Sequence, residues 1–292
     1  MKIKSQIVLF IVLAFSIAWI LFLLIPLLGL TYGEPRSIIL LTGAMFAPAI
    51  ASLLTRVITK EGFKNMLLKP NFKGNVQKYV GIYFGPTLLI LFSGLFYFLL
   101  FPQNYNPDLS QYPPGIVALG ITQIALVGPV INIIPTLGEE LGWRGYLLPK
   151  LRKLFSDRTS LVISGVIWGL WHAPVIIMGH NYGNQYPLYP YLGIIAMVVF
   201  CLFLGIIEGY FTIKMNSVIP AAMIHSTVNA GAALPLLLVK QGVNQVIGPT
   251  IAGLVGGIPF FVVAIILFVR WRSPKTLQDD QSVEREKLSP FN

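Results

Sequence analysis

Six polar side chains, all set in apolar sequence, are the residues of this chain whose types and spacing could do chemistry. They are Glu139, Glu140, Arg144, His172, His225 and Asn229. A charged side chain at the centre of a bilayer costs on the order of 2.5–3.5 kcal/mol or more, so ionisable residues at that depth pair with one another and mark a working site. Carboxylate, imidazole and amide groups together indicate acid–base chemistry in a membrane cavity.

Hydrolysis of a peptide bond is a reaction that these groups could perform. It needs a base to activate water, a group that stabilises the developing oxyanion, and an acid for the leaving amine. The sequence has no serine or cysteine placed as a nucleophile elbow and no HExxH pattern. Glu139, His172 and His225 could still bind zinc with one open position, and zinc would lower the pKa of its water to about 7. Bound metal and a metal-free glutamate base both stay open.

The first polar group occupies one helical turn. Glu140 and Arg144 are four residues apart, so on a helix they share a face and can form an ion pair. Glu139 points about 100° away and is free for another task. A bland alternative is a capping box of Thr136 and Glu139 after Pro135, but it leaves Glu140 and Arg144 unexplained.

The two histidines are interpreted as site residues because they occur together with other polar groups. His172 alone, in an apolar segment, would more often be a packing residue. His225 and Asn229, however, lie one turn apart and therefore share a helix face. Glu208 is a further acid in apolar sequence, and it is either a partner behind the site or a water-facing residue near a helix end. His180 is expected to be a solvated loop residue, and Cys201 a packing residue.

The segments that must position these groups are membrane spans. The chain is 55% hydrophobic and 11% charged, whereas soluble domains have roughly 25% charged residues. A span needs about 20 mostly apolar residues, and the sequence predicts an all-α bundle of about eight spans. They run approximately over Ile7–Leu30, Ile38–Ile58, Tyr79–Phe101, Ile116–Ile134, Ser160–Met178, Tyr191–Ile213, Val218–Val239 and Val246–Val269. The first is expected to be a retained helix, because the apolar run is too long for a signal peptide.

We expect one membrane domain over residues 1–272, with its motif-bearing core at about 116–232, and a disordered cytoplasmic tail at 273–292. With the N-terminus inside, 18 of the 21 Lys and Arg residues fall in inner segments, Arg36 and Lys240 lie outside, and Arg144 is in the motif. Both termini are therefore predicted to be cytoplasmic. The net charge of +10 is explained by attraction to anionic lipid headgroups, and no nucleic-acid partner is expected.

Two further features concern the inner side. The segment Glu61–Lys69 alternates apolar residues with lysines and is predicted to be a helix on the inner membrane surface. Pro129, Asn132 and Pro135 interrupt the fourth span, and broken helices at membrane depth are tolerated where they line a cavity. We therefore expect a water-accessible pocket that opens toward the cytoplasm.

The order of these motifs resembles a known family. Glu-Glu-x-x-x-Arg from Glu139, aromatic-x-x-x-His from Trp168 and His-x-x-x-Asn from His225 are similar to the CAAX protease and bacteriocin-processing family of intramembrane endopeptidases. These are often called CPBP or Abi proteins and are related to the Rce1-type prenyl endopeptidases. The resemblance covers about Ile116 to Ala232. The family often has phenylalanine where this chain has Trp168, a mild departure.

The resemblance implies a role for each matching residue. Glu139 with His172 would activate water, His225 and Asn229 would stabilise the oxyanion, and Glu140 with Arg144 would hold the shape of the site. Family members are described both as metalloproteases and as metal-free glutamate enzymes, and we favour the second.

The implied function is cleavage of a peptide or protein near the inner membrane face, with a prenylated protein or a bacteriocin precursor as possible substrate. Two alternatives remain: a proton-coupled transporter that uses the same acids and histidines as a relay, and a non-enzymatic immunity or scaffold protein.

Overall fold

Long apolar segments form helices here because backbone groups in lipid must find their hydrogen-bond partners within the segment. The computed structural model describes residues 1–110 and 113–271, and this part of the chain is helical apart from loops and one isolated bridge between Tyr105 and Val239. The predicted all-α membrane bundle is confirmed. The predicted tail, residues 273–292, lies outside the described residues.

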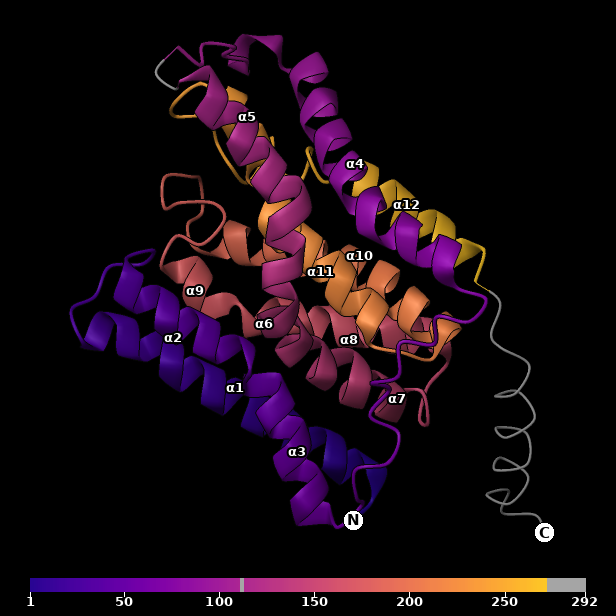
Figure 1. Cartoon of the computed structure of the whole chain (residues 1–292). Helices are drawn as coiled ribbons and strands as arrows, with labels where there is room; N and C mark the ends of the chain where they lie inside the picture. The colour runs from indigo at the N-terminus through magenta and orange to yellow at the C-terminus, as the bar shows by residue number, and fades with distance from the viewer. Residues whose placement is uncertain (111–112, 272–292) are drawn as a thin grey trace.

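The helices follow one another in a single chain order (Figure 1). Those of the first half are α1 Ile3–Leu27, α2 Pro35–Met45, α3 Ala47–Thr59, α4 Val76–Leu100, η1 Pro102–Asn104, α5 Pro114–Thr122 and η2 Gln123–Val127. Those of the second half are α6 Gly128–Gly142, η3 Trp143–Leu147, α7 Leu148–Leu151, α8 Asp157–Trp171, α9 Ala173–Ile177, α10 Tyr191–Met215, α11 Ile219–Gly231, η4 Leu234–Leu238 and α12 Ile258–Val269. The segments η2 and η3 are π-helical turns.

Helices α6, α8, α10 and α11 form the middle of the bundle. Helix α6 packs against α11, α8 packs against α10, and α10 packs against α11. Helices α1 to α3 cover one side of this group, and α4 and α12 cover another (Figure 1). The predicted polar motifs all belong to the four middle helices or their ends.

Five of the predicted spans correspond to long apolar helical segments in the described residues. They are Ile3–Leu27, Pro35–Thr59, Val76–Leu100, Tyr191–Met215 and Ile219–Leu238. The spans predicted at 116–134 and 160–178 instead contain helices joined at η2 and at His172. The last predicted span was wrong over 246–257, where the chain turns repeatedly before α12 begins at Ile258. Glycines at 248, 253, 256 and 257 lie in that stretch and disfavour helix.

The segment 61–69 is not the predicted surface helix. Its backbone is irregular, and Gly62, Asn65 and Leu67 have φ values of 74°, 63° and 58°, in the left-handed region that a right-handed helix excludes. The Leu67 carbonyl instead accepts a hydrogen bond of 2.9 Å from the backbone N–H of Val218. The segment is thereby attached to the turn between α10 and α11.

Two glycines of α8 allow its backbone to lie in direct contact with the backbone of α10. A Cβ added to Gly165 would lie 2.7 Å from the Cα of Leu202, and one added to Gly169 would lie 2.5 Å from the Cα of Val198. Small residues permit such close helix contacts in membranes, where packing rather than water exclusion holds helices together. This contact fixes the end of α8, which carries His172.

Two basic residues from different predicted inner segments, Arg56 and Lys150, lie near Glu61 at one end of the bundle. The Glu61 carboxylate accepts hydrogen bonds from Lys150 and from the Tyr146 hydroxyl at 2.6 Å, and Lys150 also donates to Gln6 at 2.7 Å. These contacts join the start of α1, the end of α3 and α7. The arrangement agrees with the predicted common location of these segments, and their cytoplasmic orientation stays a prediction.

The Glu61 cluster predicts a pH-dependent stability. Burial alone would raise the pKa of Glu61, but the hydrogen bonds from Lys150 and Tyr146 outweigh it and lower the pKa below 4.5. The stabilisation is therefore complete above pH 4.5 and is lost as pH falls through the lower, folded-state pKa. We expect Glu61→Gln to lower the thermal unfolding temperature in detergent at pH 7 and to remove this acid-dependent loss.

Lys150→Met provides the matched partner variant. If the carboxylate acts through Lys150, the double variant should unfold at a temperature above that expected from adding the two single effects. Additive effects would contradict a direct pair.

Candidate active site

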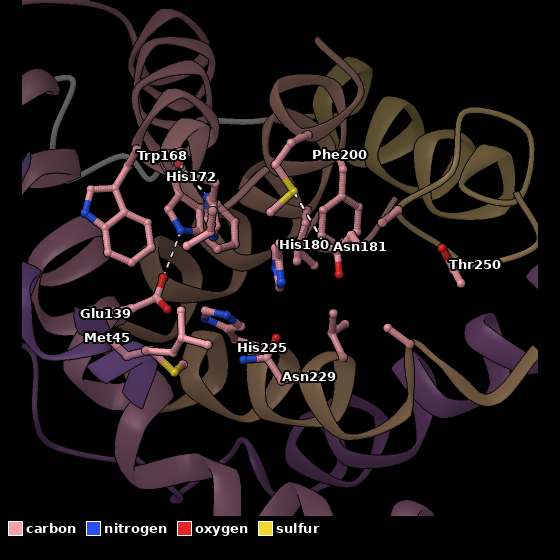
Figure 2. A pocket seen from close by; sticks show the side chains of 18 of the residues that line it. Met45, Glu139, Trp168, His172, His180, Asn181, Phe200, His225, Asn229 and Thr250 are labelled. Atoms are coloured by element: carbon pink, nitrogen blue, oxygen red, sulfur yellow. Dashed lines mark hydrogen bonds between the residues drawn. The ribbon is translucent and has the colours of Figure 1, made fainter. Parts of the chain in front are cut away.

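A cavity of about 300 Å³ lies among the middle helices, and Glu139, His172, His225 and Asn229 all line it (Figure 2). Glu139 comes from α6, His172 follows the last residue of α8, and the other two come from α11. The sequence predicted that these four residues would meet at one pocket, and they do. Glu140, Arg144 and Glu208 lie behind the wall and do not line the cavity.

Trp168 orients the first two of these residues. Its indole Nε1–H donates to Glu139 Oε2 at 2.9 Å, and its backbone carbonyl is 2.9 Å from His172 Nδ1. A carbonyl only accepts, so Nδ1 of His172 carries the proton and Nε2 of the neutral ring has a lone pair. The chain can turn at His172 because the next helix, α9, begins at Ala173 with Pro174 in its first turn, where the missing N–H of proline is not needed.

His225 is held from the opposite side. Its Nδ1 is 2.9 Å from Glu140 Oε1, and its ring lies edge-on to the Trp168 ring with 5.2 Å between centroids. The carboxylate oxygen accepts, so Nδ1 donates and Nε2 is left for a ligand. Asn229, one turn along α11, is exposed in the pocket wall and makes no hydrogen bond within the described part of the chain. Its amide can therefore donate to a bound substrate.

Arg144 neutralises two buried acids behind this wall. Its Nη1 lies 2.9 Å from Glu140 Oε1 and its Nη2 lies 2.5 Å from Glu208 Oε2. The guanidinium also covers the Trp168 ring at 4.2 Å from the centroid. Arg144 is 1% exposed and both acids are fully buried. Of the two alternatives predicted for Glu208, the structure therefore has the partner behind the site and not the water-facing residue near a helix end.

The predicted zinc ligands do not form a ready metal site. Among the described residues, the group with ligand atoms within 4.8 Å of one another is Glu140, Glu208 and His225, not Glu139, His172 and His225. Arg144 already pairs with both carboxylates of that group, and His225 Nδ1 already bonds Glu140. A cation there would have to displace Arg144, so this donor set does not fit zinc.

His180 was wrongly predicted to be a solvated loop residue. It lines the same cavity, and its Nδ1 forms a hydrogen bond with the hydroxyl of Tyr32. Its ring is parallel to that of His172, with an interplanar angle of 4° and 6.3 Å between centroids (Figure 2). The sequence feature that could have indicated this position is that the chain has only three histidines, which could all belong to one site. No sequence feature indicated Tyr32, because it lies in a loop far away in the sequence.

The cavity extends away from the basic end of the bundle. Tyr32 lies in the loop between α1 and α2, His180 follows α9, and Thr250 precedes α12; all three line the cavity. Gln6, which joins the cluster around Glu61, lies near the start of α1, whereas Tyr32 follows the end of that helix, so the cluster and the cavity loops lie toward opposite ends of α1. With the predicted orientation these loops are at the outer end, and the opening of the pocket toward the cytoplasm stays a prediction.

Comparison with known proteins agrees with the motif order. A family model described as Type II CAAX prenyl endopeptidase Rce1-like matches residues 121–231, which include all four pocket residues and the Arg144 cluster. The predicted resemblance to the Rce1-type family is confirmed. The chain is also 28% identical over 216 residues to CAAX prenyl protease 2 of Methanococcus maripaludis, covering 70% of this chain and 74% of that protein. Both similarities support an intramembrane endopeptidase.

The Arg144 cluster predicts a large contribution to the stability of the folded protein. Removing one member of a buried ion pair costs about 3–5 kcal/mol, since the partner stays buried without compensation. Arg144→Met should therefore lower the thermal unfolding temperature of the purified protein strongly.

Adding Glu208→Gln to Arg144→Met should restore part of the loss, because it removes one of the two unpaired charges. An Arg144→Met protein that unfolds at the wild-type temperature would show that the cluster contributes little.

Proposed function

We propose that this chain hydrolyses a peptide bond with water activated by Glu139 and His172. The observation that carries the proposal is that, of three neighbouring acids, two are paired with Arg144 and one is not. Glu140 and Glu208 are paired with Arg144 behind the wall, whereas Glu139 lines the cavity and has only the Trp168 indole as hydrogen-bond partner within the described residues. Glu139 is thus the carboxylate available to a substrate.

In this mechanism a water molecule binds between Glu139 and the lone pair of His172 Nε2. The base removes a proton as the water oxygen attacks the scissile carbonyl carbon, which forms the new C–O bond and places negative charge on the carbonyl oxygen. The same proton is then given to the departing amine nitrogen as the C–N bond breaks. The products are a carboxylic acid and an amine, and the base is restored.

Asn229 and His225 are suited to stabilise the oxyanion. Hydrogen-bond donors fixed in advance at the position of developing charge are usually the largest contribution to such catalysis. The Asn229 amide donates without reorganising other bonds. An imidazolium at His225 would donate from Nε2, and its charge would be balanced by Glu140, whose oxygen it already contacts.

We propose a lipid-modified peptide as substrate class. The relative from Methanococcus maripaludis is named a CAAX prenyl protease, so a prenylated peptide is the first candidate, and a bacteriocin precursor is another peptide compatible with the motifs. Apolar side chains supply much of the cavity wall, which suits a substrate that enters from the membrane. They include Phe22, Leu41, Met45, Phe200, Leu204 and Val228.

We further propose that both termini are cytoplasmic. The support is that 18 of the 21 Lys and Arg residues fall in the predicted inner segments, together with the rule that Lys and Arg collect in cytoplasmic loops. Labelling of single cysteines introduced at Lys4 and at Lys240 in intact cells should leave the first protected and modify the second.

The proposed roles predict a loss of cleavage without a loss of folding. Glu139→Gln should reduce kcat by at least about a hundredfold, since general bases contribute roughly 10²–10⁴-fold, and His172→Ala should do the same. The measurement is cleavage of an internally quenched, prenylated peptide that ends in a CAAX sequence, using purified protein in detergent.

Asp108→Asn is the matched control, because it makes the same acid-to-amide change at an exposed loop residue that does not line the cavity, and it should leave the rate unchanged. Full activity in Glu139→Gln would overturn the assignment of the base.

A metal-free base predicts insensitivity to chelators. We expect less than one zinc per chain by elemental analysis and unchanged cleavage after dialysis against EDTA. Stoichiometric zinc that is lost in His172→Ala, with activity restored by added zinc, would instead support metal-bound water.

A further inference from the structure

The cavity contains a second polar pair that the proposed mechanism does not use. The Tyr32 hydroxyl, from the loop between α1 and α2, forms a hydrogen bond with Nδ1 of His180, which follows α9. Their rings meet edge to face at 5.8 Å between centroids. Both residues line the cavity, and Figure 2 shows the His180 ring in the same space as His172, His225 and Asn229.

The direction of this hydrogen bond follows from the partners available. The Tyr32 hydroxyl has no other hydrogen-bond partner within the described residues, so its proton is satisfied only if it donates to Nδ1. Burial raises the pKa of Tyr32 to about 12 and lowers the pKa of His180 to about 4. Near neutral pH the phenol therefore keeps its proton and the imidazole is neutral.

A neutral imidazole that accepts at Nδ1 carries its proton on Nε2. Nε2 of His180 forms no hydrogen bond with the described part of the chain, so its N–H is available to a ligand in the cavity. His172 has the opposite tautomer, because its Nδ1 donates to the Trp168 carbonyl. The two parallel imidazoles therefore offer a lone pair on one ring and an N–H on the other.

We propose that His180, oriented by Tyr32, donates from Nε2 to an oxygen of the bound peptide and thereby positions the scissile bond against His172. The acceptor is a backbone carbonyl or a terminal carboxylate, which share the same hydrogen-bonding chemistry. This inference rests on the proposed peptidase function. In it, His180 is a substrate-binding residue and Tyr32 is a positioning residue that acts through His180.

The experiment separates binding from chemistry. Tyr32→Phe removes one hydroxyl and preserves the ring, and His180→Phe removes both ring nitrogens. Each should raise KM for the quenched prenylated peptide roughly three- to tenfold, the effect of one neutral hydrogen bond, with kcat changed less than KM. His180→Gln retains an amide N–H donor and should recover part of the loss, which a purely structural role would not predict.

Tyr189→Phe is the matched control. Tyr189 lies in the same loop region and its hydroxyl donates to the Ile177 carbonyl, but it does not line the cavity. Its KM should equal that of the wild type. An equal rise of KM in Tyr189→Phe would show that the loop, and not the Tyr32–His180 pair, is responsible, and would overturn the inference.

A peptide whose last residue lacks the terminal carboxyl group identifies the oxygen that is bound. If the acceptor is the terminal carboxylate, this decarboxylated peptide should have the same KM in the wild type and in His180→Phe. If it is a backbone carbonyl, His180→Phe should raise KM for the acid and the decarboxylated peptide equally. Wild-type KM values in His180→Phe and Tyr32→Phe for the acid peptide would overturn the inference.

Failure of the inference is distinct from failure of the proposed function. Inactive Glu139→Gln together with wild-type kinetics in His180→Phe would preserve the peptidase and reject only the role of His180. Absence of cleavage of this peptide by the wild type as well as by Glu139→Gln would reject the peptidase, and the inference with it.

Discussion

The site depends on a guanidinium buried between two carboxylates. Isolated charges in an apolar bundle are costly, and a buried pair is retained only when each charge is compensated in good geometry. Arg144 meets this requirement with Glu140 on its own helical segment and Glu208 on α10, and Glu140 in turn bonds His225 on α11. One cation thus fixes the relative positions of α6, α10 and α11. The same pairing leaves Glu139 as the acid that faces the cavity.

Close backbone contact with α10 then brings α8 to this cluster. Gly165 and Gly169 allow α8 to lie directly on α10, which places the Trp168 ring on Arg144 at 4.2 Å. From that position the indole N–H reaches Glu139 and the backbone carbonyl reaches His172. Trp168 therefore contacts both the Arg144 cluster and the pocket residues, so a shift of the cluster would also change the orientation of Glu139 and His172.

The sequence could predict the parts of this arrangement that follow from local spacing. The four-residue spacing of Glu140 and Arg144 predicted their ion pair, and long apolar runs predicted most of the helices. It could not assign Glu208, because that depends on which helices become neighbours. It misjudged His180, because the Tyr32 contact joins two loops that are 148 residues apart. It also missed the left-handed residues that prevent a helix near Asn65.

Trp168 shows how a substitution that looks mild in sequence acquires a physical role in the fold. The resembling family often has phenylalanine at this position, which supplies an aromatic face but no N–H. In this chain the indole keeps the face, which covers Arg144, and adds the only hydrogen bond that Glu139 receives within the described residues. An ionised carboxylate accepting one fixed donor has one oxygen held and the other free to meet water. Here the orientation of the proposed base therefore comes from the aromatic residue of the second motif, and the cost of burying Glu139 is reduced by the same contact.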